Sequence, residues 1–149
     1  MTEERDQSNI AQAVYQKMTD RDHFSKWMGV ELIEISEGYC KLRMTAREEM
    51  LNGFGILHGG VSFAFADSAF AFASNSHGRL SVSLNASMTY SKSGKEGDIL
   101  VAEAKELTLG NRTGTYDVTV TNQTTTEVMA LFRGTVFRTD KQHLESDTI

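Results

Sequence analysis

The sequence of 149 residues contains no proline and only one cysteine, Cys40. Without proline, the tight turns must depend on glycine, asparagine, aspartate and serine, which also favour turn conformations. A single cysteine excludes an intramolecular disulfide bond and a metal site built from several cysteines. Stability must therefore come from a hydrophobic core, and the chain is long enough for one domain with such a core.

No apolar segment approaches the ~20 residues that a membrane-spanning helix needs. The first residues, Met-Thr-Glu-Glu-Arg-Asp, are polar and acidic, unlike a signal peptide. Lysine and arginine number 15 against 20 aspartates and glutamates, so the chain carries a net charge of -5. An acidic chain is a poor nonspecific binder of nucleic acid, and an anionic ligand would need a local basic patch. We expect a cytoplasmic protein with no membrane or nucleic-acid partner.

The segment from Gly60 to Asn75 is dominated by alanine and phenylalanine, and Asp67 is its only charged residue. It is too long for one strand, and alanine is the best helix former. A helix that is apolar on every side must be buried on every side, so we predict a central helix wrapped by the rest of the chain. The helical neighbours of Asp67 at positions 63, 64, 70 and 71 are phenylalanine or alanine. A charge in such surroundings is costly unless something satisfies it, which makes Asp67 the first functional candidate.

Hydrophobic periodicity predicts the remaining elements. Helical spacing over 8–18 predicts a short amphipathic helix after a frayed polar end. Alternation predicts strands over 30–35, 39–44, 81–89, 98–109, 115–122 and 128–138. We expect connections over 20–26 and 48–55 and disorder over 141–149. With no internal repeat or linker, we predict a single domain over 1–149, with its core at about 29–138.

The order of these elements predicts an α+β fold. Short turns between consecutive strands indicate antiparallel pairing, so one long curved sheet would wrap the central helix. In the strand over 98–109, Ile99, Val101, Leu107 and Leu109 share one side. In the strand over 81–89, Ser83 and Asn85 share a polar face, which fits either a pocket wall or a solvated surface. The open edges of such a sheet suggest homo-oligomerisation.

Several motifs along the chain, taken together and in this order, resemble one family. They are Leu51-Asn52-Gly53, His58-Gly59-Gly60, Ala66 to Ala71, Asn75-Ser76, 110–117 and Leu131 to Gly134. The set is similar to the signature of the hotdog-fold acyl-CoA thioesterases of the phenylacetic-acid-degradation type, the PaaI family, and it covers roughly 29–138. The resemblance implies a hotdog fold, a homodimer usually assembled into a homotetramer, and active sites at the subunit interface. Coenzyme A would enter as part of the substrate, so neither a separate cofactor nor a metal is implied.

The resemblance also assigns roles by position. Asp67 would be the catalytic carboxylate, and the Gly59 N–H would polarise the thioester carbonyl. Asn52 and His58 would organise the site, with Gly60, Ser68, Ser83 and Asn85 near the substrate. The turn residues Asn111, Arg112 and Thr113 would lie near the nucleotide part of coenzyme A.

The chemistry of thioester hydrolysis agrees with these roles. It needs a base or nucleophile for the acyl carbon and hydrogen-bond donors for the developing oxyanion. A helix N-terminus offers free N–H groups, and the glycines at 59 and 60 let a carbonyl approach them. Asp67 lies about seven residues further, roughly 10 Å along the helix, too far for one helix to place both groups on one carbonyl. Two antiparallel helices across a two-fold axis would bring them together.

Several roles remain open at this level. Asp67 can attack directly or activate water. His58 can act as a base, although a histidine that shapes the turn explains it better. Ser68 lacks a Gly-x-Ser-x-Gly elbow, so it is either a ligand-orienting group or an ordinary helix hydroxyl. Arg112, Lys92 and Lys95 can bind phosphate or be solvated, and Phe63, Phe65, Phe70 and Phe72 can form the core or line an acyl pocket.

We therefore expect an acyl-CoA thioesterase acting on an aryl-acyl (phenylacetyl-type) or medium-chain acyl-CoA. A hotdog dehydratase is disfavoured because the histidine–acid pairing of that class is not evident. A non-catalytic acyl-CoA-binding module is the alternative from a different functional class.

Overall fold

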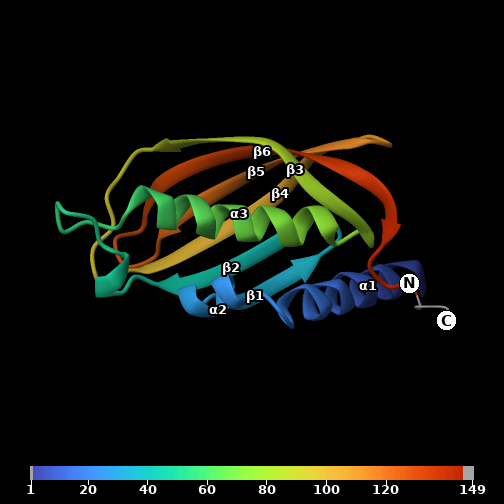
Figure 1. Cartoon of the computed structure of the whole chain (residues 1–149), viewed down its shortest axis with the longest axis horizontal. Coiled ribbons are helices and arrows are strands. Elements are labelled where there is room, and N and C mark those ends of the chain that lie inside the picture. The colour runs from blue at the N-terminus through green and yellow to red at the C-terminus, as the bar shows by residue number, and fades with distance from the viewer. Residues whose placement is uncertain (1, 146–149) are drawn as a thin grey trace.

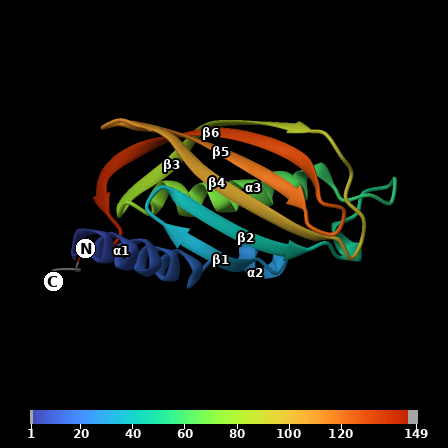
Figure 2. The ribbon, with the colours of Figure 1, turned by 180° about the vertical axis from the view of Figure 1, so that it is seen from behind.

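Six strands form one antiparallel sheet in the order β1-β2-β4-β5-β6-β3. The computed structural model describes residues 2–145, with side chains described from residue 6. The strands are β1 (Glu31–Ser36), β2 (Tyr39–Thr45), β3 (Arg79–Tyr90), β4 (Ile99–Leu109), β5 (Thr113–Asn122) and β6 (Glu127–Gln142). The helices are α1 (Thr2–Thr19), α2 (His23–Met28) and α3 (Gly59–Asn75), with a short 3-10 turn at Glu48–Met50. Figure 1 looks onto α3 with the curved sheet behind it, and Figure 2 shows the sheet from the other side. The predicted α+β hotdog architecture is confirmed.

The core lies between α3 and the concave face of the sheet. Phe65 and Phe70 of α3 are buried, and the Phe70 ring packs against Tyr116 of β5 and Phe132 of β6 at centroid distances of 5.8 and 5.4 Å. Phe63 is half-buried and meets Phe132 edge-on. Cys40 on β2 faces the same core with no exposed surface, and this burial raises the pKa of its thiol to about 12.

Gly134 of β6 lies directly against the Phe70 ring of α3. A Cβ atom there would stand 2.6 Å from Cζ of Phe70, well inside contact distance. We expect Gly134→Ala to lower the free energy of unfolding by about 1–3 kcal/mol, because the Phe70 ring must shift within a packed core. Thermal unfolding followed by circular dichroism would show this as a fall in Tm.

Gly53→Ala is the matched control for this change, because no heavy atom lies within 4 Å of the added Cβ at that position. Its Tm should stay close to that of the wild type. An equal Tm for the two variants would contradict the packing described for Gly134.

Three local predictions need correction. The N-terminal helix begins at Thr2 rather than near Ser8, so the stretch taken as frayed is helical. The expected connection over 20–26 contains the start of α2, which is capped at its N-terminus by Asp22 and ends at Gly29 with a φ of 73°. Strand β6 continues to Gln142, so the disorder predicted from residue 141 is wrong for its first two residues. Residues 146–149 of that prediction lie outside the described residues.

The residues of β4 that face the core are not the apolar set that its alternation grouped on one side. Leu100, Ala102 and Ala104 are fully buried in the core, whereas Leu107 and Leu109 are exposed. Both sides of this strand carry apolar residues, so alternation alone could not choose between them.

Among residues 2–145, no helix is both long and apolar enough to cross a membrane.

Candidate active site

The N-terminus of α3 is capped by His58. Its backbone is extended (φ -61°, ψ 131°), and its Nδ1 accepts a hydrogen bond of 2.8 Å from the Gly60 N–H. The His58 carbonyl oxygen accepts from the N–H groups of Val61 and Ser62. Within the described part of the chain, the Gly59 N–H is therefore the first-turn donor left without an acceptor. The structure supplies one free backbone donor at the positive end of the helix dipole.

The two glycines serve different contacts. A Cβ on Gly60 would stand 2.9 Å from Nδ1 of His58, so any side chain there would displace the imidazole from its capping position. A Cβ on Gly59 would stand 3.3 Å from the ring of Tyr90, whose hydroxyl donates to the Gly59 carbonyl oxygen at 3.1 Å. Tyr90 thus holds the first turn of α3 from the end of β3, a role that sequence reasoning missed.

We expect His58→Ala to lower the free energy of unfolding by about 1 kcal/mol, the usual cost of losing an N-cap acceptor. Asparagine is a favourable N-cap residue, so His58→Asn should recover most of this loss. Urea titration of both variants would measure the difference. Equal stability of His58→Ala and the wild type would show that the cap contributes nothing.

Asn52 organises the loop that leads into this cap. Its Oδ1 accepts from the N–H groups of Phe54 at 2.9 Å and Ile56 at 3.4 Å, and its own N–H donates to the Ile56 carbonyl. Gly55 closes the turn with a φ of 74°. The side-chain oxygen of Asn52 therefore fixes the loop, and Phe54 is left 91% exposed at its tip.

Asp67 lies half-buried in the middle of α3. No hydrogen bond or ion pair joins its carboxylate to any residue that the structure describes. Burial raises the pKa of this carboxyl above its usual value of 3.8. The acid is thus held partly desolvated and without a counter-charge, a state that suits a group acting on a bound molecule.

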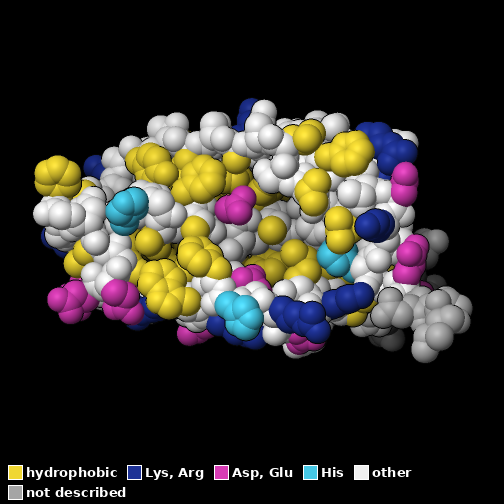
Figure 3. Space-filling view, in the orientation of Figure 1, with side chains coloured by type: hydrophobic (Ala, Val, Ile, Leu, Met, Phe, Trp, Pro, Cys, Tyr) yellow, Lys and Arg dark blue, Asp and Glu magenta, His cyan; other side chains and the backbone are white. Residues whose placement is uncertain are grey.

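The surroundings of Asp67 correct the prediction that α3 is buried on every side. Gly60 is exposed, and Ala64, Asp67, Ser68 and Ala71 are only half-buried, so a stripe of the helix remains uncovered. Figure 3 shows hydrophobic side chains gathered on this face of the molecule, with isolated acidic ones among them. The sheet curves around the other sides of α3 but leaves this stripe open.

Ser68 points toward α2. Its Oγ lies 3.2 Å from Oγ of Ser25, which donates to the Asp22 carboxylate at 2.7 Å. This chain of contacts connects the middle of α3 to the N-terminal cap of α2. A ligand-orienting role for Ser68 remains a prediction.

The prediction that Ser83 and Asn85 share a face is wrong. Ser83 pairs with the buried Val136, and Asn85 pairs with Thr135, so a β-bulge between them reverses the alternation. Paired side chains lie on one face of the sheet. Ser83 therefore faces the α3 side, and Asn85 faces the outside.

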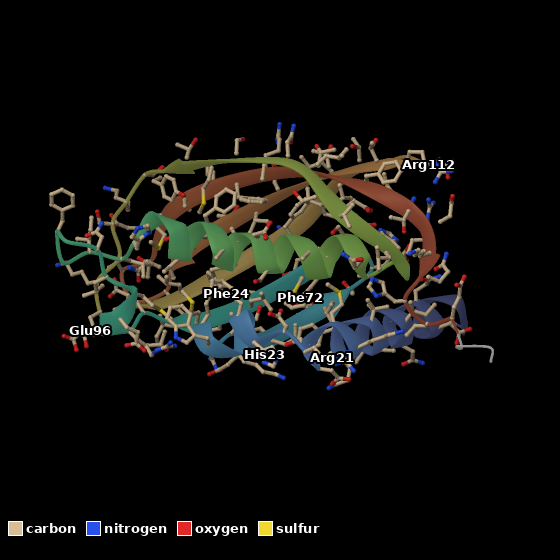
Figure 4. All side chains as sticks on the ribbon, viewed as in Figure 1. Arg21, His23, Phe24, Phe72, Glu96 and Arg112 are labelled. Atoms are coloured by element: carbon tan, nitrogen blue, oxygen red, sulfur yellow. The ribbon has the colours of Figure 1, made fainter. Side chains whose placement is uncertain are left out.

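The turn that carries Asn111, Arg112 and Thr113 lies at the opposite end of the molecule from the His58 cap. In Figure 4, Arg112 is labelled at the end of the sheet near the last turn of α3, whereas Glu96 is labelled at the other end. Arg112 donates to the Asp140 carboxylate at 2.8 Å. Lys92 pairs with Glu127 at 3.7 Å. It lies four residues before Glu96, at the end of the molecule opposite Arg112, so the two basic side chains do not form one patch.

Two further arginines join this turn. Arg79 reaches Asn111 Oδ1 at 3.4 Å, and Arg138 donates to the Gly110 carbonyl at 2.8 Å. The pairing of β3 with β6 brings both arginines to this end of the sheet. The sequence offered no signal for this pairing, because the two strands are separated by β4 and β5.

Comparisons with known proteins are consistent with this geometry. Residues 54–129 match the family model of the Thioesterase superfamily. The acyl-coenzyme A thioesterase PaaI of Escherichia coli is 39% identical over 78% of this chain and 83% of its own length. The solved structure of the E. coli PaaI protein from the phenylacetic acid degradation operon superposes with a TM-score of 0.88 at 36% identity, over 91% of this chain and 97% of that one.

A third relative was solved with a ligand. The structure of smu.793 from Streptococcus mutans, bound to acetyl CoA, is 33% identical with a TM-score of 0.73, over 76% of this chain and 90% of that one. These relatives match the chain in sequence as well as in fold, over most of its length. The chain therefore belongs to the Thioesterase superfamily, as a hotdog-fold thioester hydrolase of the PaaI type.

Proposed function

We propose that this protein hydrolyses an aryl-acyl (phenylacetyl-type) or medium-chain acyl-CoA to the free acid and coenzyme A. The observation that carries the proposal is Asp67, a half-buried acid with a raised pKa and no partner among the described residues, on an uncovered stripe of α3. The E. coli relative is named an acyl-coenzyme A thioesterase, and the S. mutans relative binds acetyl CoA. Both support an acyl-CoA as the substrate.

In the proposed reaction, Asp67 takes a proton from water as the water oxygen attacks the acyl carbon. The carbonyl oxygen becomes an oxyanion and accepts a hydrogen bond from the Gly59 N–H. Collapse of the tetrahedral intermediate breaks the carbon–sulfur bond, and the leaving thiolate of coenzyme A takes the proton that Asp67 received from water. A second route is direct attack by the Asp67 carboxylate, which forms an anhydride that water then hydrolyses. His58 and Asn52 act in both routes by holding the N-terminus of α3.

A second copy of the chain completes the proposed site. Asp67 lies eight residues beyond Gly59, which is ~12 Å along one helix, so these two groups cannot meet on one carbonyl within one chain. In Figure 1, α3 lies in front of the sheet, and β3, which is an edge strand, passes beside it. A two-fold axis there would set two α3 helices antiparallel and place Asp67 of one chain opposite Gly59 of the other. We propose a homodimer on this surface and a homotetramer built from it.

The basic end of the sheet is proposed to bind the nucleotide phosphates. Arg79, Arg112 and Arg138 gather around the turn at Asn111 and Thr113, and Asp140 pairs with Arg112 there. Arg112 lies near the last turn of α3 (Figure 4), whereas His58 caps the first turn of that helix. One chain would then supply Asp67 and the phosphate contacts, and its partner would supply Gly59. No separate cofactor is needed for this reaction, and we propose that it takes place in the cytoplasm.

The test is thiol release from acetyl-, hexanoyl-, phenylacetyl- and palmitoyl-CoA. We expect kcat/KM to be highest for the phenylacetyl or hexanoyl thioester. Uniform activity on all four would contradict the proposed acyl preference. If the protein bound these thioesters without releasing thiol, the better interpretation would be a non-catalytic acyl-CoA-binding module.

A further inference from the structure

A cavity of about 210 Å³ lies between α1, α2 and α3. Its apolar lining comes from Tyr15 of α1, Phe72 of α3 and Val30, and its polar lining comes from Thr19, Asp22, Ser25 and Lys26. The rings of Tyr15 and Phe72 meet edge-on at a centroid distance of 4.9 Å. In Figure 4, Phe72 lies between α3 and the junction of α1 with α2, which the labels of Arg21 and His23 mark.

Ser68 connects this cavity to the proposed catalytic group. Phe72 lies five residues beyond Asp67, which is ~7.5 Å along the helix axis and about 140° around it, so the connection between them runs through Ser68. Ser68, next to Asp67 in sequence, lies one turn from Phe72 on the same face of α3. Ser68 contacts Ser25, and Ser25 is itself part of the cavity wall. An acyl group that leaves Asp67 along Ser68 would therefore point toward the cavity wall at Ser25.

Size and polarity indicate what the cavity holds. An apolar protein cavity of about 150 Å³ is known to bind benzene, so 210 Å³ is enough for one aromatic ring or a short alkyl chain. The carboxylate of Asp22, the acid in the wall, already accepts hydrogen bonds from Ser25. The remaining wall offers mainly carbon to a ligand.

We infer that this cavity binds the distal end of the acyl group and that α1, through Tyr15, limits its length. The inference rests on the proposed function and deepens it. A phenylacetyl or hexanoyl group fits, an acetyl group does not reach the cavity, and a palmitoyl chain exceeds its volume. The N-terminal helix then acts as a specificity element rather than only as a cover for the sheet.

The test compares a cavity-filling variant with a cavity-enlarging one. Val30→Phe should lower kcat/KM for phenylacetyl- and hexanoyl-CoA by roughly 10–200-fold and leave acetyl-CoA within about threefold. Tyr15→Ala should shift the preference in the opposite direction, toward longer chains. Val128→Phe is the matched control, because Val128 lies on β6 outside the cavity and is 45% exposed; its acyl profile should equal that of the wild type.

Equal losses on all acyl groups in Val30→Phe, or no change in the profile of either variant, would overturn the inference. A binding measurement separates it from the proposed reaction. In the Asp67→Asn variant, the methyl resonances of Val30 should shift on adding phenylacetyl-CoA but not on adding coenzyme A alone. Shifts without wild-type hydrolysis would support the cavity and refute the reaction, whereas hydrolysis without shifts would do the reverse.

Discussion

Asp67→Asn is expected to lower kcat by ~10²–10⁴-fold, the usual contribution of a positioned general base. Asparagine keeps the shape of the side chain but cannot take a proton or attack the acyl carbon. The carboxylate has no hydrogen-bond partner in the described structure, so its replacement breaks no internal contact. Substrate binding and the folded state should therefore persist, and thiol release under saturating acyl-CoA would measure the loss. Near-normal turnover would remove Asp67 from the mechanism.

The raised pKa of Asp67 adds two pH-dependent results. Because its pKa in the folded protein lies above the unfolded value, the charged form is the one that folding disfavours. The carboxylate therefore lowers stability at neutral pH, and this penalty fades as the pH falls through the folded pKa. Asp67→Asn should have a higher Tm than the wild type at pH 7, and the gap should close in acid. The acidic limb of kcat/KM should likewise lie above pH 3.8.

Asp117→Asn is the matched control for both results. Asp117 accepts two hydrogen bonds from Arg133, which lower the pKa of its carboxyl. Its ion pair stabilises the fold above the unfolded pKa, and that contribution is lost as the pH falls through the lowered folded value. The control should thus lose a little stability at neutral pH and keep full turnover. A Tm rise in both variants would show that the Asp67 effect is not specific.

Gly59→Pro is expected to lower kcat by ~10²–10³-fold relative to Gly59→Ala, the usual effect of removing one oxyanion donor. Proline replaces the N–H at this position with a ring carbon, and it is favoured as the first residue of a helix. The extended conformation of His58 is the one required before a proline. Alanine introduces the same contact with the Tyr90 ring but retains the N–H, so the pair isolates the donor. Equal kcat values would exclude the Gly59 N–H from the reaction.

Mixing the two inactive variants tests whether the site is shared. If Asp67 and Gly59 act from different chains, a heterodimer of Asp67→Asn and Gly59→Pro contains one intact site and one doubly altered site. Random pairing at equal amounts would leave about one quarter of all sites intact, because each intact site needs one chain of each kind. Coexpressed mixtures should therefore regain ~25% of wild-type activity. If verified mixed oligomers regained no activity, Asp67 and Gly59 would act within one chain or in different steps of the reaction.

Much of the fold could be predicted from local pattern. The helix over the segment from Gly60 to Asn75 was predicted correctly, because its composition and its glycines determine a helix and its start without reference to other strands. The hairpin of β1 and β2 followed for the same reason. Helix α2 was missed because six residues are too few for helical periodicity to show, although Asp22 and Ser25 form its N-terminal cap.

The remaining features depend on contacts between distant residues. The β-bulge that separates the faces of Ser83 and Asn85 arises from the pairing of β3 with β6, and alternation within β3 alone gives no sign of it. The same pairing brings Arg79 and Arg138 to the turn at Arg112. The uncovered stripe around Asp67 could not be predicted from composition, because an apolar helix is equally compatible with burial by its own chain or by another.

The burial of Cys40 has a practical consequence. It is the only thiol in the chain, it is fully enclosed by the core, and its pKa near 12 keeps it protonated at neutral pH. Since the thiolate is the reactive form, the native protein should give no background with thiol reagents. Colour from such a reagent would then report released coenzyme A alone in an activity measurement. Without substrate, the slow reaction of one sulfur per chain would measure how often the core opens. The same reagent would therefore measure both the rate of turnover and the rate of unfolding.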